Sequence, residues 1–158
     1  MVWVSLDDAR AYAAWAGARL PTEAEWQRAA EGPESTEWPW GHSFDPAKCN
    51  GDSDSTTPVS AYPEGASAWG CLDMSGNTWE WTESERDDGH MRYVMVRGGC
   101  YARVTGSIWY TASGAQPCGV HEKVPLLGGG IDRLATVGFR CVALGAEFPR
   151  GGPRISRL

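Results

Sequence analysis

The sequence predicts an α+β domain in which two short helices flank a small twisted sheet and irregular loops fill much of the rest. Helical spacing of apolar residues is confined to the first 32 residues, whereas strand-like alternation begins only near residue 78. Glycine (20) and proline (10) make up about a fifth of the 158 residues, which is below the share typical of disorder. Nine tryptophans indicate a packed aromatic core.

Two helices are predicted near the start of the chain. Ser5 can cap a first helix that ends at Gly17, with apolar residues recurring at helical spacing from Leu6. Thr22 and Glu25 form a capping box directly after a proline, and Gly32 ends the second helix. The alanine-rich faces of both helices suit close packing against a flat partner, so we expect them to lie on a sheet.

The remaining chain is predicted to be loop and short strands. Residues 32–63 are rich in turn-forming residues, and strands are expected over 78–82, 93–97 and 137–143. The polar run 49–55 fits either a solvated turn or a loop that binds a hard cation through oxygen atoms, although it does not match an EF-hand. We expect one domain over residues 1–146 and a flexible tail over 147–158.

Composition and cysteine usage limit the classes of function. The formal charge of −6 argues against a nucleic-acid surface, which is usually basic. No apolar run is long enough for a membrane helix, and the N-terminus lacks a signal-peptide pattern, so no membrane partner is expected. Five widely spaced cysteines cannot all pair, and none forms a CxxC motif. A reduced, cytoplasmic setting is therefore predicted.

Six motifs in order carry a resemblance to a known family. The chain resembles the sulfatase-modifying factor family, the formylglycine-generating enzymes and their relatives, from about residue 4 to residue 142. The motifs are GARLPTEAEW (17–26), WG (40–41), TPV (57–59), LDMSGNTWEW (72–81), VRGG (96–99) and GFR (138–140). The resemblance implies a fold like that of C-type lectins, with short helices around a mostly antiparallel sheet.

The resemblance leaves the activity open. Members of the family include copper-dependent oxidases that convert a cysteine of a sulfatase to formylglycine, and iron-dependent enzymes whose metal ligands come from a second domain. Others are variable ligand-binding proteins made by diversity-generating retroelements. Because one fold serves several functions, the site residues have to decide between them.

The resemblance implies a calcium site within the motif LDMSGNTWEW (72–81), at the turn that precedes its two tryptophans. In the family, side chains at the positions of Asp73 and Glu80 and backbone carbonyls at those of Gly76 and Thr78 hold the ion, and such oxygen atoms suit calcium. The alternative is that Asp73 only caps the turn and Glu80 is a surface strand residue. A second family site falls near Asn50 and Asp54, where this loop is shortened.

The copper-binding cysteine pair of the oxidases is absent. Its two positions are occupied by Arg103 and Ile108, although soft thiolates are the ligands that Cu(I) prefers. A relocated copper or iron site would need Cys100, Cys118 and His121 to come together. Calcium is therefore the favoured cofactor, copper and iron are disfavoured, and no catalytic residue is predicted.

Three functions remain as hypotheses. The first is a non-oxidase ligand-binding or accessory domain that binds a protein, a peptide or a small molecule through the segment from residue 100 to 136. The second is a nonheme-iron enzyme or a subunit of one, and the third is a copper-dependent cysteine oxidase. The residues expected to contact a ligand in the first case are Cys100, Arg103, Trp109, Tyr110 and His121.

The start of the chain predicts a partner. Family domains usually carry a further segment before the motif that begins here at Val4, so the resemblance implies that a sheet edge is left exposed. Proteins rarely leave such an edge bare. We therefore expect a homodimer, or a partner subunit that supplies the segment.

Overall fold

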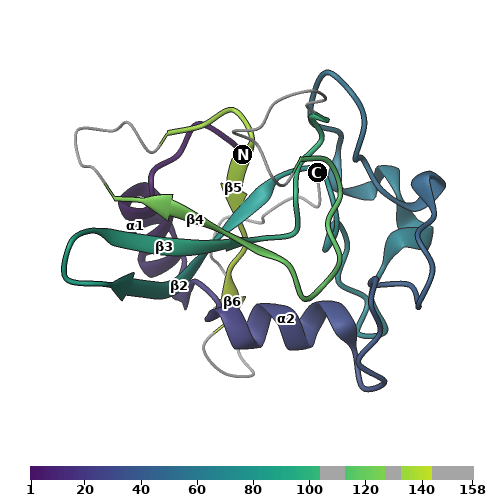
Figure 1. Cartoon of the computed structure of the whole chain (residues 1–158), viewed down its shortest axis with the longest axis horizontal. Helices are drawn as coiled ribbons and strands as arrows, with labels where there is room; N and C mark the ends of the chain where they lie inside the picture. Colours follow the sequence, from purple (N-terminus) through teal and green to yellow (C-terminus); the bar gives the residue numbers. More distant parts are fainter. Residues whose placement is uncertain (104–112, 127–132, 144–158) are drawn as a thin grey trace.

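The computed structural model describes residues 1–103, 113–126 and 133–143. Figure 1 shows two helices, α1 (Leu6–Trp15) and α2 (Glu23–Glu31), packed around a twisted sheet. The long segment between α2 and the strand that begins at Trp79, drawn in blue to teal, fills the right-hand side of the molecule in this view. The α+β class predicted from the sequence is confirmed.

Both helices begin at the predicted caps. Ser5 accepts a hydrogen bond from the backbone of Asp8 (3.1 Å), and the Asp8 carboxylate accepts one from the Ser5 backbone (2.9 Å). Thr22 and Glu25 make the same reciprocal pair at the start of α2. Gly32 ends α2 with a φ of +66°, a conformation that glycine adopts without steric cost.

The main sheet has the strand order β4-β3-β2-β5. Its central antiparallel pair consists of β2 (Trp79–Asp87) and β3 (Arg92–Arg97), and β4 (His121–Pro125) pairs antiparallel with β3. The fourth strand, β5 (Val137–Phe139), runs parallel to β2. The sheet is therefore mixed but mostly antiparallel, as the resemblance implied. The parallel pairing is possible because the chain makes a long crossover between residues 87 and 137.

The strand predicted over 137–143 divides into two. The first part is β5, and the second is β6 (Val142–Ala143), which pairs with β1 (Ala18–Arg19) in a separate small sheet. The break falls at Arg140, whose side chain turns toward Glu80 of β2. The connector between the two predicted helices is therefore itself a strand.

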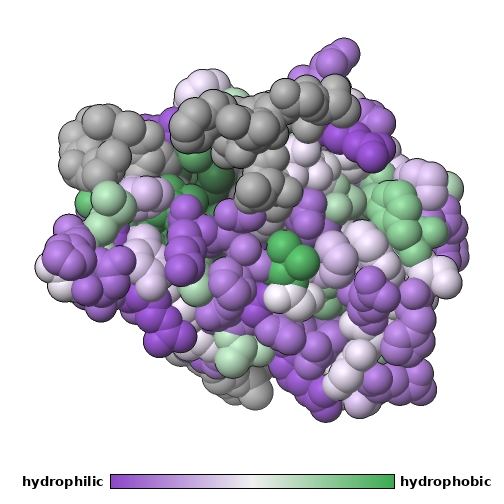
Figure 2. Space-filling view, in the orientation of Figure 1, coloured by the Kyte–Doolittle hydropathy of each residue, from purple (hydrophilic) through white to green (hydrophobic). Residues whose placement is uncertain are grey.

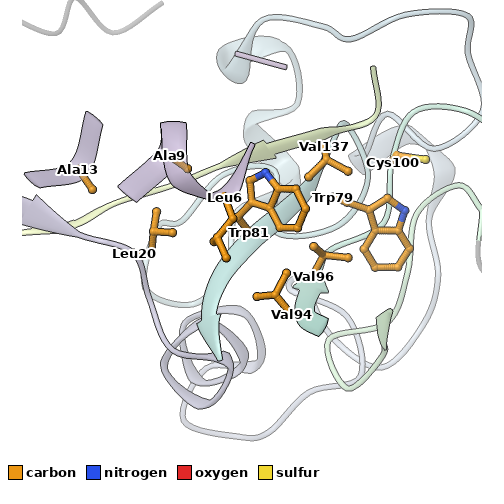
Figure 3. Close-up of a cluster of buried hydrophobic side chains, with 10 residues drawn as sticks. All are labelled: Leu6, Ala9, Ala13, Leu20, Trp79, Trp81, Val94, Val96, Cys100 and Val137. Carbon is orange, nitrogen blue, oxygen red and sulfur yellow. The ribbon is translucent and has the colours of Figure 1, made fainter. Parts of the chain in front are cut away.

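The main core lies between α1 and the sheet, as Figure 3 shows. Small side chains on α1, including Ala9 and Ala13, let the helix approach Trp81 and Val94 closely. The Trp81 indole N–H donates to the Val4 carbonyl (2.9 Å), so the ring is both buried and hydrogen-bonded. A second cluster under α2 contains Trp26, Ala30, Met74 and Cys118.

A buried arginine connects α2 to the sheet. Arg97 of β3 is 2% exposed, and its guanidinium donates to the carbonyls of Cys118 (3.1 Å) and Val120 (3.0 Å). The same group lies 3.2 Å from the Glu23 carboxylate and donates to Gln27. Burial lowers the pKa of Arg97, although Glu23 partly offsets that effect.

The visible surface is mainly hydrophilic. In Figure 2 the apolar residues of this face form small separate groups among polar ones. Three short 3₁₀ turns punctuate the loop region between α2 and β2, at Pro46–Lys48, Val59–Ala61 and Pro63–Gly65. Within the described residues, no helix is both long and apolar enough to span a bilayer. The tail predicted over 147–158 lies outside the described residues.

Candidate functional site

The predicted calcium turn leads directly into β2. Three of its residues have left-handed backbone conformations: Asp73 (φ +52°), Gly76 (φ +83°) and Asn77 (φ +65°). Asparagine and aspartate tolerate this region better than other residues with side chains. These conformations turn the backbone tightly, so that the predicted ligands Asp73 and Gly76 lie on one short loop.

Asn77 organises this turn. Its side-chain amide donates to the Asp73 carboxylate (3.2 Å) and to the Thr57 carbonyl (3.2 Å), while its side-chain oxygen accepts from the Thr57 backbone (3.0 Å). Its backbone N–H donates to the Asn50 carbonyl (2.7 Å). Sequence reasoning assigned no role to Asn77, although it stands inside the tryptophan motif.

Asp73 carries an unused acceptor. Its Oδ2 atom accepts from Asn77, but its Oδ1 atom is buried and has no hydrogen-bond partner among the described residues. The pKa of Asp73 is raised to about 6, mainly by burial and also by the nearby Glu80 carboxylate, while the Asn77 hydrogen bond opposes this rise. A buried carboxylate oxygen without a donor fits a hard cation, so Asp73 meets the requirement of the predicted site.

Glu80 was predicted to be either a calcium ligand or a surface strand residue, but its carboxylate already has several hydrogen-bond donors. The side chain is buried, so it is not a surface strand residue. Its Oε2 atom accepts from the Trp26 indole (2.6 Å) and from Nε of Arg140 (2.5 Å), and its Oε1 atom accepts from Nη2 of Arg140 (2.7 Å). A cation at this turn would therefore share the Glu80 carboxylate with a guanidinium.

Arg140 also holds the backbone of the turn. Its Nη2 atom donates to the carbonyls of Leu72 (3.0 Å) and Asp73 (3.4 Å) in addition to Glu80. With Asp73 and Glu80 each carrying one negative charge and Arg140 one positive charge, the ionised group keeps a net charge of −1. That residual negative charge favours a cation, and Asp73 Oδ1 is the carboxylate oxygen that no described donor occupies.

The two predicted carbonyl ligands lie on the same turn. The Gly76 carbonyl accepts from the Thr78 backbone (2.9 Å), and the Gly76 N–H donates to the Gly98 carbonyl (2.7 Å). A Cβ atom on Gly76 would lie 2.4 Å from the Asn50 carbonyl oxygen. Only glycine fits between these two segments in this conformation.

The second predicted metal loop is joined to the first at Asn50. The Asn50 amide is buried and donates to the Ser55 carbonyl (2.9 Å), and its side-chain oxygen accepts from the Ser53 hydroxyl (2.6 Å). Asp54, by contrast, is exposed. Asn50 therefore acts as a loop organiser in this structure, with its side-chain oxygen already occupied.

The segment predicted to bind a ligand, residues 100–136, begins beside the candidate calcium turn and the Asn50 loop. The Tyr101 N–H donates to the Asn77 carbonyl (3.0 Å), and the Tyr101 carbonyl accepts from Ser53 (2.9 Å). Cys100 and Ala102 exchange backbone hydrogen bonds with Gly114 (2.9 and 2.8 Å). Ala102 and Gly114 are thus paired with each other, and Tyr101 joins them to the candidate calcium turn. Trp109 and Tyr110 lie outside the described residues.

The other predicted ligand residues are spread apart. Cys100 is buried, its thiol donates to the Ala102 carbonyl (3.4 Å), and burial raises its pKa. Arg103 is exposed and pairs with Asp52 at 3.7 Å, and His121 lies at the edge strand with Nδ1 3.2 Å from Glu23. Of these residues, Arg103 and His121 are accessible, whereas the Cys100 thiol is not.

The relocated copper or iron site finds no support in the described geometry. Cys100 belongs to the core under α1, whereas Cys118 belongs to the separate cluster under α2. Burial raises the pKa of Cys118 to about 12, which opposes the thiolate that a metal needs. In the part of the chain that is described, no three His, Cys, Asp or Glu residues are placed to hold a metal ion.

A comparison with known families decides the relationship. Residues 1–144 match the sulfatase-modifying factor enzyme 1-like domain. The chain belongs to the sulfatase-modifying factor family. The resemblance inferred from the six motifs is therefore confirmed, and so is the family fold.

Relatives of this sulfatase-modifying factor domain have different activities. The chain is 35% identical over 176 residues to an inactive C-alpha-formylglycine-generating enzyme 2 of Bos taurus, covering 96% of this chain and 52% of that protein. It is 48% identical over 88 residues to a hercynine oxygenase of Mycolicibacterium thermoresistibile, covering 51% of this chain and 20% of that protein. The chain thus spans about a fifth to a half of these relatives.

Solved structures agree on the architecture. PvdO from Pseudomonas aeruginosa superposes with a TM-score of 0.67 at 22% identity, over 87% of this chain and 59% of that one. Treponema denticola variable protein 1 superposes with a TM-score of 0.53 at 28% identity, over 77% and 46%. The sulfatase-modifying factor domain therefore shares its fold with proteins of more than one kind.

Proposed function

We propose that this chain is a calcium-stabilised ligand-binding or accessory domain that does not perform the cysteine oxidation of its catalytic relatives. The observation that carries the proposal is the network around Asn77. One asparagine fixes the Asp73 turn through its side chain and receives the Tyr101 N–H on its backbone carbonyl. An ion that orders the turn would therefore also order the base of the ligand segment.

Calcium would be held by a small set of oxygen atoms. Asp73 Oδ1 supplies the free carboxylate oxygen, and the carbonyls of Gly76 and Thr78 lie on the same turn. Glu80 contributes an oxygen that it shares with Arg140. Because calcium takes six to eight oxygen ligands, water would complete the shell. The second predicted site, at Asn50 and Asp54, would be weaker, because an ion there would have to displace the Ser53 hydroxyl from the Asn50 side-chain oxygen.

The non-oxidase part rests on the segment after the glycine pair. Arg103 stands where the oxidases have a metal-binding cysteine, and a guanidinium is not a copper ligand. The two cysteines between residues 100 and 136, Cys100 and Cys118, are both buried. Burial raises the pKa of each thiol, which opposes formation of a metal-binding thiolate. The segment is then available for binding a protein, a peptide or a small molecule through Arg103, Trp109, Tyr110 and His121.

Chelation followed by calcium titration tests the first part. We expect calcium to raise the melting temperature of the wild type, since a ligand at about a hundred times its Kd adds about 2.7 kcal/mol of stability. Asp73→Asn should abolish the calcium-dependent rise, whereas Asp7→Asn, an exposed residue of α1, should retain it. A wild type whose melting temperature ignores calcium would contradict the proposal.

A peptide assay tests the second part. A sulfatase-derived cysteine peptide incubated with the protein, copper and oxygen should yield no aldehyde. The same peptide bound to the protein without turnover would support a binding role. Formation of formylglycine would show that oxidation runs without the usual cysteine pair.

A nonheme-iron or copper oxidoreductase, or a subunit of one, is the second candidate. The observation that favours it is the identity of 48% to a hercynine oxygenase over about half of this chain. Metal analysis of the purified protein separates the two candidates. Calcium alone fits the binding domain, while stoichiometric iron or copper would favour the enzyme.

A cytoplasmic location is part of the proposal. All five cysteines are free thiols in this structure, and Cys49, Cys100 and Cys118 are buried. Free thiols are typical of a reducing compartment. Fractionation of cells that express the natural gene would test the location directly.

A further inference from the structure

A hollow of about 430 Å³ lies between the end of α2 and the loop region that follows it. Its wall combines the Trp40 ring and two prolines with three glutamates and one lysine: Glu31, Glu34, Glu64 and Lys48. None of these residues belongs to the metal turn or to the ligand segment. The volume falls within the range of small-molecule sites and at its lower end.

The aromatic wall is held in place. Trp40 stacks on Trp38 with ring centres 5.8 Å apart and planes at 20°, and its indole N–H donates to the Ser43 carbonyl (3.0 Å). Trp38 in turn exchanges two backbone hydrogen bonds with Gly41 (2.8 and 3.0 Å). The ring is therefore positioned before any ligand arrives, which lowers the entropic cost of binding.

The two sides of the hollow are also fixed. The Thr36 hydroxyl lies 3.1 Å from the Glu31 carbonyl and 2.7 Å from the Trp38 carbonyl, which joins the end of α2 to the aromatic wall. On the other side the backbone of Gly65 packs so closely on the Lys48 carbonyl that a Cβ atom would overlap it. The hollow is thus a preformed feature of the loop region.

The charges around the hollow select the ligand. Three carboxylates against one ammonium leave the lining with a net charge of −2. Glu34 and Glu64 are exposed, and neither forms an ion pair with any described residue. An aromatic face with carboxylates around it favours cations, because the ring quadrupole and the negative charges attract the same ligand.

We propose that this hollow binds a small organic cation, an alkylammonium or guanidinium compound, against the face of Trp40. The size argues for a free small molecule rather than an extended peptide, which needs a longer groove. The cation lies near Glu34 and Glu64, and its apolar body contacts Trp40 and the prolines. This site is independent of calcium at Asp73, so it stands even where the calcium proposal fails.

The experiment compares choline with 3,3-dimethylbutan-1-ol, which has the same shape without the charge. Binding is followed by the NMR signal of the Trp40 indole N–H, which Trp40→Phe identifies by its disappearance. We expect choline to shift this signal saturably and to bind at least about tenfold more tightly than the alcohol, with the difference shrinking at high salt.

Charge variants provide the matched control. The double variant Glu34→Gln with Glu64→Gln should weaken choline binding about tenfold. Glu37→Gln removes an exposed glutamate of the same loop that does not line the hollow, and it should leave the affinity unchanged. Equal affinity for choline and the alcohol, an equal loss in the Glu37 variant, or no saturable shift would each overturn the proposal.

Discussion

At the scale of single residues, Glu80 shows how a motif residue acquires its role from distant partners. The motif places a carboxylate two residues into β2, and the fold then surrounds it with Trp26 of α2 and Arg140 beyond β5. A buried carboxylate needs such donors, because burial of an unpaired charge is costly. Glu80 therefore stabilises the junction of three elements in addition to facing the candidate metal turn.

Replacing Glu80 by glutamine should be strongly destabilising. The change removes the one carboxylate that the half-buried Arg140 guanidinium contacts directly, so we expect a loss of about 3 kcal/mol in the free energy of unfolding. Urea denaturation in chelator measures this loss without a contribution from calcium. Glu83→Gln breaks the more exposed pair with Arg10 and should cost less than about 1 kcal/mol. Equal losses in the two variants would contradict the assigned role.

The site could be predicted only in part at this scale. Asp73, Gly76, Thr78 and Glu80 stand together in one motif, so their proximity follows from the sequence. The roles of Asn77 and Arg140 do not, because their partners lie at Thr57 and Glu80, 20 and 60 residues away. A local pattern cannot state which distant donor reaches a given carboxylate.

At the scale of elements, α2 begins at a charged capping box whose strength depends on pH. Glu25 accepts from the Thr22 backbone and pairs with Arg19 at 2.6 Å. Arg19 and, to a smaller extent, the Thr22 backbone lower the pKa of Glu25 from 4.5 to about 2. The stabilisation is therefore fully present above about pH 4.5 and is lost as the pH falls through about 2.

A glutamine at this position tests the pH dependence. Glu25→Gln should lower stability at neutral pH by well under about 1 kcal/mol, because the pair is largely exposed to solvent. The difference between variant and wild type should shrink as the pH falls from about 4.5 toward 2. Thermal unfolding across this range measures it, and a difference that stays constant with pH would refute the assignment.

The contact of the metal turn with the Asn50 loop gives a second test at this scale. Gly76→Ala combines a left-handed φ with a Cβ atom 2.4 Å from the Asn50 carbonyl, so we expect a loss of about 3 kcal/mol or more. Gly70→Ala has a similar φ of +78° but open space around it, and should cost about 1 kcal/mol. Similar midpoints of denaturation for both variants would show that the contact is not tight.

The elements themselves were predictable where their signals are local. The caps at Ser5 and Thr22 and the alternation at the start of β2 and in β3 depend on neighbouring residues. Both helices and β3 were therefore placed correctly, whereas β2 continues to Asp87, beyond the predicted end at residue 82. The strand β4 was missed because His121–Pro125 has three polar residues in a row and ends in a proline, so its sequence shows no strand-like alternation. The pairing of β1 with β6 joins residues 18 and 143, and two-residue strands leave no periodicity to detect.

At the scale of the whole molecule, the sheet has two unlike edges. Near β5 the chain start packs closely, since a Cβ on Gly138 would lie 2.6 Å from the Met1 carbonyl and Trp3 donates to Leu134 (3.1 Å). At the other edge, β4 has no further strand among the described residues. The partner that we expect, a second copy or another subunit, would add to β4.

Light scattering from low to high micromolar concentration tests this association. We expect the mass to rise with concentration toward that of a dimer, or a stable complex when the natural partner is supplied. Lys123 and Pro125 on β4 weaken strand addition, so the self-association should be modest. A monomer throughout the range that also melts in one cooperative transition would argue against any partner at this edge.

The pairing of β1 with β6 affects how the chain can fold during its synthesis. A ribosome makes a chain in the N-to-C direction, so the small sheet closes only when residues 142–143 have left the exit tunnel, and β5 must likewise emerge before it can join β2. Such high contact order slows folding. Until residues 137–143 have emerged, Trp79 and Trp81 therefore lack their last covering strand, and the nascent chain is then most open to chaperones and to aggregation.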